Sequence, residues 1–118
     1  MFRVIISGTR DFQDYELLRN YADFKLSNIT GDIEIVSGGA RGADTLGERY
    51  ARERGYQVKR FPADWKQYGR AAGPKRNEAM AKYADALLAY WNGRSPGTKN
   101  MIDLAKAHGL KVGVKLYE

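Results

Sequence analysis

The sequence predicts an α/β protein in which helices cover both faces of a five-stranded parallel sheet. Apolar, strand-like runs alternate with segments whose apolar residues recur at helical spacing, which is the pattern of repeated β–α–β units. The strand-like runs are Phe2–Ser7, Ile33–Ser37, Tyr56–Phe61, Asp85–Trp91 and Lys111–Leu116. The stretches Val4–Ile6 and Ala86–Tyr90 are continuously apolar, as strands buried on both faces require.

Two helices are expected in the first half of the chain. Apolar residues from Tyr15 to Ile29 follow helical spacing, and Asp14 is placed to cap the start of this helix. The second helix runs from Thr45 to Arg54. It should end at Gly55, because glycine is the usual residue just beyond a helix.

Two more helices are expected in the second half. The first contains the apolar positions from Ala79 to Ala84 and is entered through Gly73–Pro74. The second contains the apolar positions from Met101 to His108. Thr98 is expected to cap it, and Gly109 is expected to end it.

This alternation predicts a doubly wound sheet with right-handed crossovers, strand order 3-2-1-4-5, and one domain spanning residues 1–118. Ligands of such sheets bind beyond the carboxyl ends of the strands, where the strand order reverses. Here the reversal lies between the first and fourth strands. The loops Gly8–Arg10 and Asn92–Thr98 would flank the crevice, with Gly38–Gly42 beside it.

The most informative of these loops is the glycine-rich segment Ser37–Asp44. Gly38, Gly39 and Gly42 allow close backbone approach just before a helix, where free N–H groups and the helix dipole favour an anion such as phosphate. The alternative is a tight strand-to-helix turn without a ligand. The same two interpretations apply to Gly8 and Thr9.

Charge and composition favour an anionic partner. The net charge is +6, and many cations follow the strand-like runs: Arg10, Arg41, Lys66, Arg70, Lys75, Arg76, Arg94 and Lys99. A solvated basic surface would explain any one of them. The chain has no cysteine and a single histidine, so we expect no metal and a reducing, cytoplasmic location. We expect no membrane association, because no apolar run approaches the roughly 20 residues of a membrane span.

The segment Pro62–Gly73 is the only long connection, and long connections in small domains are often functional. Trp65 and Tyr68 could stack on a base, with Lys66 and Arg70 beside them. Alternatively, Trp65 packs over the edge of the sheet.

Three motifs together resemble the YspA/YpsA-related branch of the SLOG (SMF/DprA–LOG) superfamily. They are Ser7–Arg10, Ser37–Asp44 and Gly73–Met80, followed by Pro96–Thr98. The resemblance implies a Rossmann-like three-layer fold and a nucleotide or nucleotide-derived ligand, with no further cofactor. Relatives include LOG-type phosphoribohydrolases, which cleave a base from a nucleoside monophosphate, and DprA, which binds single-stranded DNA.

The match to the phosphoribohydrolases is partial. Asn77 stands in place of the lysine of their Arg-Lys-x-x-Met motif, and Met101 stands where their second motif has a glutamate. Cleavage of a glycosidic bond relies on a carboxylate, so the expected catalytic group is missing. Glu48, Glu78 or Asp44 could supply one from another direction.

We therefore expect a nucleotide-binding module, and the alternatives are a hydrolase of a nucleoside phosphate or ADP-ribose-like substrate and a single-stranded DNA binder. Arg76 would pair with an anion, the alternative being a surface arginine. The Asp44–Glu48 pair would bond ribose hydroxyls, although Asp44 could equally stabilise the N-terminus of its helix, and Asn92 would bond a base or ribose edge. The expected ligand-binding residues are Gly8, Thr9, Arg10, Ser37, Gly38, Gly39, Arg41, Gly42, Asp44, Arg76, Asn77, Asn92, Gly97 and Thr98. The sequence leaves the oligomeric state open, a homo-oligomer included.

Overall fold

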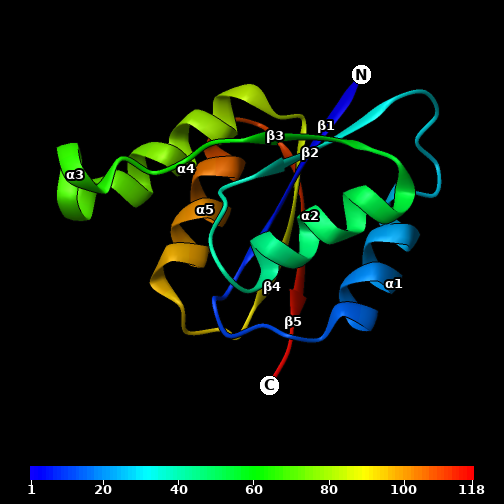
Figure 1. The fold of residues 1–118 in the computed structure, drawn as a ribbon, viewed down its shortest axis with the longest axis horizontal. Coiled ribbons are helices and arrows are strands. Elements are labelled where there is room, and N and C mark those ends of the chain that lie inside the picture. Colours follow the sequence, from blue (N-terminus) through cyan, green and yellow to red (C-terminus); the bar gives the residue numbers. More distant parts are fainter.

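A computed structural model describes all 118 residues, and its core is a five-stranded parallel sheet (Figure 1). The strands are β1 (Phe2–Gly8), β2 (Ile33–Ser37), β3 (Gln57–Arg60), β4 (Ala86–Trp91) and β5 (Lys111–Leu116). Their order is β3-β2-β1-β4-β5, and every pair is parallel. The predicted fold class and strand order are confirmed.

Helices form a layer on each face of the sheet. They are α1 (Tyr15–Leu26), α2 (Ala43–Arg54), the short α3 (Trp65–Tyr68), α4 (Ala72–Tyr83) and α5 (Pro96–Ala107). Alternate residues of β1 are buried on opposite faces of the sheet. Val4 and Ile6 pack with α1 and α2, whereas Ile5 packs with α4 and α5. Because Ile5 lies in register with Val36 of β2 and Leu87 of β4, the second core continues across three strands.

Helix ends follow the expected chemistry with one exception. The Asp14 carboxylate accepts a hydrogen bond from the Leu17 N–H at 3.1 Å, and Gly55 ends α2 with a left-handed φ of 73°. The prediction that Thr98 caps the last helix is wrong. Ser95 is the cap and Thr98 lies within the first turn, because Pro96 has the fixed φ suited to the first helical position.

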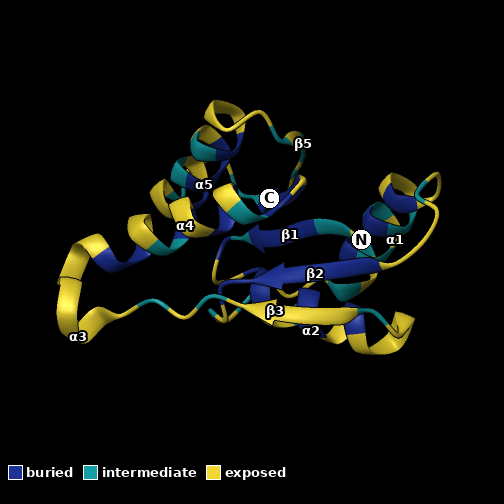
Figure 2. Ribbon diagram, turned by 90° about the horizontal axis from the view of Figure 1, so that it is seen from above, coloured by how far each residue is buried: buried dark blue, intermediate teal, exposed yellow.

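The connection between β3 and α4 contains α3 and a 3₁₀ turn, Gly69–Ala71, where the sequence predicts only a loop. The Asp64 carboxylate caps α3 by accepting from the Gln67 N–H. Figure 2 shows this segment standing away from the sheet, with its residues exposed. Trp65 and Tyr68 are 51% and 42% exposed, so Trp65 is not buried against the sheet edge.

No helix is both long enough and apolar enough to cross a membrane.

Candidate functional site

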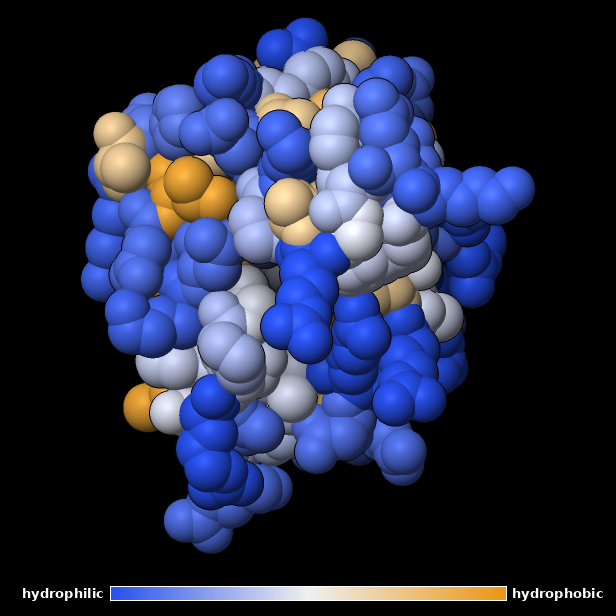
Figure 3. Space-filling model, turned by 90° about the vertical axis from the view of Figure 1, so that its left-hand side faces the viewer, coloured by the Kyte–Doolittle hydropathy of each residue, from blue (hydrophilic) through white to orange (hydrophobic).

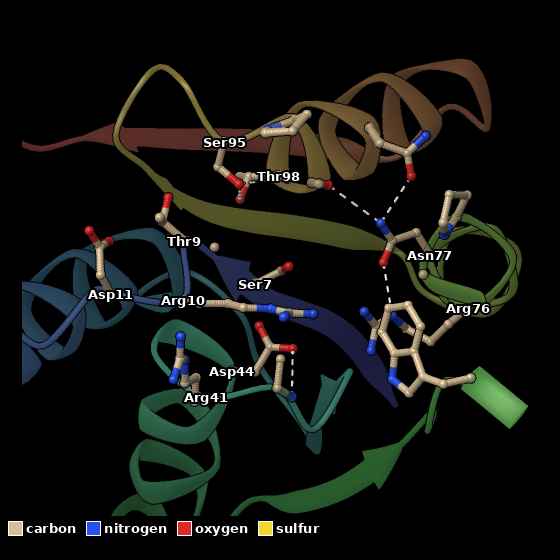
Figure 4. A pocket seen from close by; sticks show the side chains of 18 residues that line it. Ser7, Thr9, Arg10, Asp11, Arg41, Asp44, Arg76, Asn77, Ser95 and Thr98 are labelled. Carbon is tan, nitrogen blue, oxygen red and sulfur yellow. Dashed lines mark hydrogen bonds between the residues drawn. The ribbon is translucent and has the colours of Figure 1, made fainter. Parts of the chain in front are cut away.

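The carboxyl ends of β1 and β4 open into a cleft of about 600 Å³, which we call the inner cleft (Figure 4). It lies at the point where the strand order reverses. Its lining residues come from both sides of the sheet: Ser7, Gly8, Thr9, Arg10, Asp11, Ala40, Arg41, Asp44, Trp65, Gly73, Pro74, Arg76, Asn77, Ser95, Pro96, Gly97, Thr98 and Asn100.

The end of β1 forms the base of the inner cleft. The Thr9 N–H donates to the Tyr90 carbonyl at 3.0 Å, and the Thr9 hydroxyl accepts from the Asn92 N–H at 3.3 Å. A Cβ on Gly8 would lie 2.2 Å from the Tyr90 carbonyl oxygen, so only glycine lets β1 end this close to β4. Ser7 is only 8% exposed, and its hydroxyl makes no hydrogen bond to another residue. Its polar group therefore stays available to the cleft.

The loop before α2 forms one wall, and much of its hydrogen-bonding capacity is used within the protein. The Gly39 N–H donates to the Ser37 hydroxyl at 3.0 Å, and the Ala40 N–H donates to an Asp44 carboxylate oxygen at 3.3 Å. A Cβ on Gly42, whose φ is 83°, would lie 2.5 Å from the Arg10 carbonyl oxygen. The loop is therefore held against the end of β1 at Gly42, and this contact accounts for Gly42 without a ligand.

Asp44 is the buried acid of the inner cleft. It is 4% exposed in the first turn of α2, and burial raises its pKa to about 6. The hydrogen bond from Ala40 and the positive charge of Arg76 oppose that rise, while Glu48 adds to it. No cation lies within ion-pair distance of the Asp44 carboxylate. Asp44 therefore offers carboxylate oxygens that the protein satisfies only in part.

Arg76 and Asn77 of α4 form the opposite wall. The Arg76 guanidinium donates to the Gly38 carbonyl at 2.7 Å and to the Asn77 side-chain oxygen at 3.0 Å. The Asn77 amide in turn donates to the Asn100 side chain at 3.0 Å, so it links α4 to α5. Burial lowers the pKa of Arg76, and the nearby Arg10 lowers it further against the opposing effect of Asp44. Arg76 is thus a positioned cation without a carboxylate partner.

The first turn of α5 closes the remaining side. The Ser95 hydroxyl accepts from the Thr98 N–H at 3.5 Å. Gly97 lies in this turn, and a Cβ built on it would meet no atom within 4 Å. The backbone of Gly97 is therefore open to the cleft at the positive end of a twelve-residue helix.

A second hollow of about 850 Å³ adjoins the inner cleft, and we call it the outer hollow. It is lined by Arg10, Gly38, Gly39, Ala40, Arg41, Arg60, Pro62, Ala63, Trp65 and Arg76. Four of the ten are arginines, and none is an acid. Figure 3 shows the side of the molecule that carries α3, where hydrophilic side chains dominate the surface. The polarity of both hollows suits a charged ligand.

The structure brings most of the expected binding residues to these two hollows. Those that line the inner cleft are Gly8, Thr9, Arg10, Arg41, Asp44, Arg76, Asn77, Gly97 and Thr98. Gly38 and Gly39 line the outer hollow. Ser37, Gly42 and Asn92 line neither hollow. The Asn92 side chain instead accepts from the Arg94 and Ser95 N–H groups, and so shapes the turn that leads into α5.

The two candidate catalytic glutamates lie outside both hollows. Glu48 is buried and accepts hydrogen bonds from the Ser37 hydroxyl and from Arg60. Glu78 is exposed on α4 and lies 3.7 Å from the Lys82 ammonium. Met101, which stands where the hydrolase motif has glutamate, is fully buried in the core beneath α5.

Several lining residues were absent from the predicted binding set. Ser7 could have been found, because it directly precedes Gly8 at the end of a predicted strand. Asn100 could not, since only the packing of α4 against α5 brings it to Asn77. Trp65 was expected as a stacking candidate, and it lines both hollows. Its ring centroid lies 6.0 Å from the Arg10 guanidinium carbon.

Comparisons with known proteins identify a family and relatives of this chain. A profile of the YspA, cpYpsA-related SLOG family matches residues 2–68. The chain is 36% identical to the Gene 61 protein of Mycobacterium phage D29, over 95% of this chain and 94% of that protein. It also resembles a crystal structure of a predicted subunit of tRNA methyltransferase from Methanocaldococcus jannaschii. That likeness has a TM-score of 0.49 at 14% identity and covers 98% of this chain and 68% of that one.

Proposed function

The chain belongs to the YspA, cpYpsA-related SLOG family, and from that premise and the inner cleft we propose that it binds a phosphorylated nucleotide or a nucleotide-derived ligand. In this proposal the protein is a binding module that releases its ligand chemically unchanged. The observation that carries it is the convergence of three arginines, an open helix N-terminus and the free Ser7 hydroxyl on one cleft where the strand order reverses.

The phosphate would lie between the first turn of α5 and the arginines. Gly97 presents backbone without a side chain at a helix N-terminus, where partial positive charge favours an anion. Arg10, Arg41 and Arg76 line the same space. Arg76 is already fixed in place by Gly38 and Asn77, so less side-chain entropy is lost when it binds an anion.

The sugar would lie toward β1 and α2. The Ser7 hydroxyl can donate or accept a hydrogen bond, and the Asp44 carboxylate can accept from ribose hydroxyls. The Ser7 hydroxyl has no hydrogen-bond partner within the protein and lines the cleft, so it is free to contact a ligand. Trp65 offers an exposed ring on which a base could stack.

The positions of the two candidate glutamates, Glu48 and Glu78, favour binding without turnover over hydrolysis. Neither Glu48 nor Glu78 lines the inner cleft, and Met101 lies in the core. A glycosidic bond held in the cleft would meet only Asp44 and Asp11 as acids.

Calorimetric titration of the purified protein with adenosine monophosphate tests the proposal, followed by chromatography of the recovered ligand. We expect saturable binding and intact nucleotide. Free adenine among the products would establish a hydrolase instead. Absence of nucleotide binding together with binding of single-stranded DNA, weakening steeply as salt rises, would favour the nucleic-acid alternative.

A further inference from the structure

The outer hollow has no role when a single phosphate occupies the inner cleft. The two spaces are continuous, because Arg10, Ala40, Arg41, Trp65 and Arg76 line both. We propose that the outer hollow receives a second anionic group of the same ligand, so that the site takes nucleotides with two phosphoryl groups. This inference rests on the proposed function, and it adds the ligand class: a nucleoside diphosphate or a diphosphate-bridged dinucleotide.

The charge of the outer hollow is the first argument. Four arginines line it, and neither Asp11 nor Asp44 of the inner cleft is among its lining residues. Three of the four, Arg10, Arg41 and Arg76, also line the inner cleft, so their positive charge faces both spaces. Only Arg60 has an ion-pair partner, Glu48, and its side chain is still 67% exposed. Positive charges held close together repel one another until an anion neutralises them. A guanidinium group can donate two parallel hydrogen bonds to the oxygens of a phosphoryl group.

Size is the second argument. The outer hollow measures about 850 Å³ and the inner cleft about 600 Å³, each within the range of a complete small-molecule site. A mononucleotide in the inner cleft would leave the arginine-lined space vacant. Arg10 and Trp65 are close together and line both spaces. A diphosphate would pass beside them from one space to the other.

Gly39 provides a way to place a negative charge on the outer-hollow side of the arginines. It lines this hollow but not the inner cleft, and a Cβ at Gly39 would meet no atom within 4 Å. Its φ is 74°, which asparagine and aspartate tolerate better than other side chains. Gly39→Asp and Gly39→Asn therefore differ in charge at nearly equal size and backbone strain.

Gly55 is the matched control position. Its φ is 73°, and a Cβ there also meets nothing within 4 Å, but it lies at the end of α2 remote from both hollows. Gly55→Asp and Gly55→Asn report the effect of net charge alone. Thermal melting of all four variants confirms that each is folded before binding is measured.

The probes are adenosine monophosphate, adenosine diphosphate and diadenosine diphosphate, titrated by calorimetry. We expect one or both diphosphates to bind the parent about tenfold more tightly than the monophosphate, as one more charge-assisted contact provides. Gly39→Asp should weaken that binding about tenfold relative to Gly39→Asn, and it should weaken monophosphate binding by less, because the first phosphate lies on the inner-cleft side of the shared arginines. The Gly55 pair should show no such difference.

The outcomes separate the two proposals. Monophosphate binding without any gain from a second phosphoryl group would overturn this inference and leave the proposed function standing. Equal diphosphate affinities of Gly39→Asp and Gly39→Asn would also overturn it. If none of the three nucleotides binds, both proposals fail. If only diadenosine diphosphate binds more tightly than the monophosphate, the result supports a diphosphate-bridged ligand. If adenosine diphosphate binds more tightly, the result supports a ligand with a terminal diphosphate.

Discussion

Two glycine-containing turns border the inner cleft, and their glycines exist for different physical reasons. At the end of β1, a side chain on Gly8 would lie 2.2 Å from the Tyr90 carbonyl oxygen. At the start of α5, a side chain on Gly97 would touch nothing. The fold requires Gly8, whereas nothing in the protein requires Gly97. The sequence presents the two as similar loops, and only the packing distinguishes them.

This contrast divides the residues of the cleft into two classes. Residues of the first class, such as Gly8 and Gly42, are fixed by contacts within the protein. Those of the second class, Asp44 and Gly97, lower stability or leave it unchanged, as the proposed ligand site would explain. Arg76 shares features of both, because it is held by Gly38 and Asn77 but has no carboxylate partner. Substitutions in the first class should destabilise the protein, and substitutions in the second should spare or stabilise it while binding is lost.

The largest effect is expected for Gly8→Ala. The added methyl group would overlap the Tyr90 carbonyl and lie 2.8 Å from the Ala43 side chain, so β1 would have to separate from β4 and α2. We expect a loss of about 3 kcal/mol or more in the free energy of unfolding. Thermal and urea melts would measure it. A variant as stable as the parent would show that this end of β1 is not constrained by packing.

Asp44→Asn should become more stable relative to the parent as the pH rises. The pKa of Asp44 is raised from 3.8 to about 6 in the folded protein, so the folded state holds the proton more tightly than the unfolded chain does. Asp44 therefore leaves stability unaffected below about pH 4, and it costs stability progressively as the pH rises toward 6. At about 1.4 kcal/mol per pKa unit, the cost at neutral pH is about 3 kcal/mol.

Urea melts of Asp44→Asn and the parent at several pH values measure this cost. The difference in unfolding free energy should shift by about 2 kcal/mol in favour of the variant between pH 4 and pH 7. Because asparagine cannot supply a charged acceptor, nucleotide affinity should fall in the same variant. If the difference in unfolding free energy between the two proteins stays constant with pH, the pKa of Asp44 is not raised by folding and ionised Asp44 does not cost stability.

Arg76→Ala should separate binding from stability. Loss of a charge-assisted contact to phosphate should weaken nucleotide binding by about 1.5–3 kcal/mol. The melting temperature should fall only modestly, because the lost hydrogen bonds to Gly38 and Asn77 are partly offset by removing a guanidinium charge that burial disfavours. Arg76→Lys should recover only part of the affinity, since lysine lacks the planar fork. Equal affinity in all three proteins, measured by calorimetry, would place Arg76 outside the binding site.

The sequence predicts the fold well because the patterns that indicate strands and helices lie within short stretches of the chain. Continuous apolar strands, helical spacing and terminal glycines determine the order of elements, and the strand order follows from alternation. The site is predicted less completely because its contacts are long-range. Asn77 meets Asn100 only through helix packing, and the Ser37 and Asp44 side chains occupy loop N–H groups that the sequence alone leaves free for phosphate. Asn92 likewise shapes a turn instead of facing the cleft.

The smallest and sharpest test is Gly97→Ala. Gly97 lies in the first turn of α5 with an ordinary negative φ, so alanine fits the helix without strain. Alanine restricts the unfolded chain more than glycine does, and we expect a gain of about 0.5–1 kcal/mol in stability, or roughly 2–4 °C in melting temperature.

Nucleotide affinity should nevertheless fall several-fold in Gly97→Ala, because the new methyl group occupies space that a phosphate needs in order to reach the helix N–H groups. Gly109→Asn is the control, since Gly109 ends the same helix with a left-handed φ of 77° and open surroundings but lies away from the cleft. A variant that is more stable yet binds worse would show that Gly97 is kept for the ligand. If Gly97→Ala gains stability and binds as well as the parent, the anion lies elsewhere, and the contrast between the two turns loses its functional meaning.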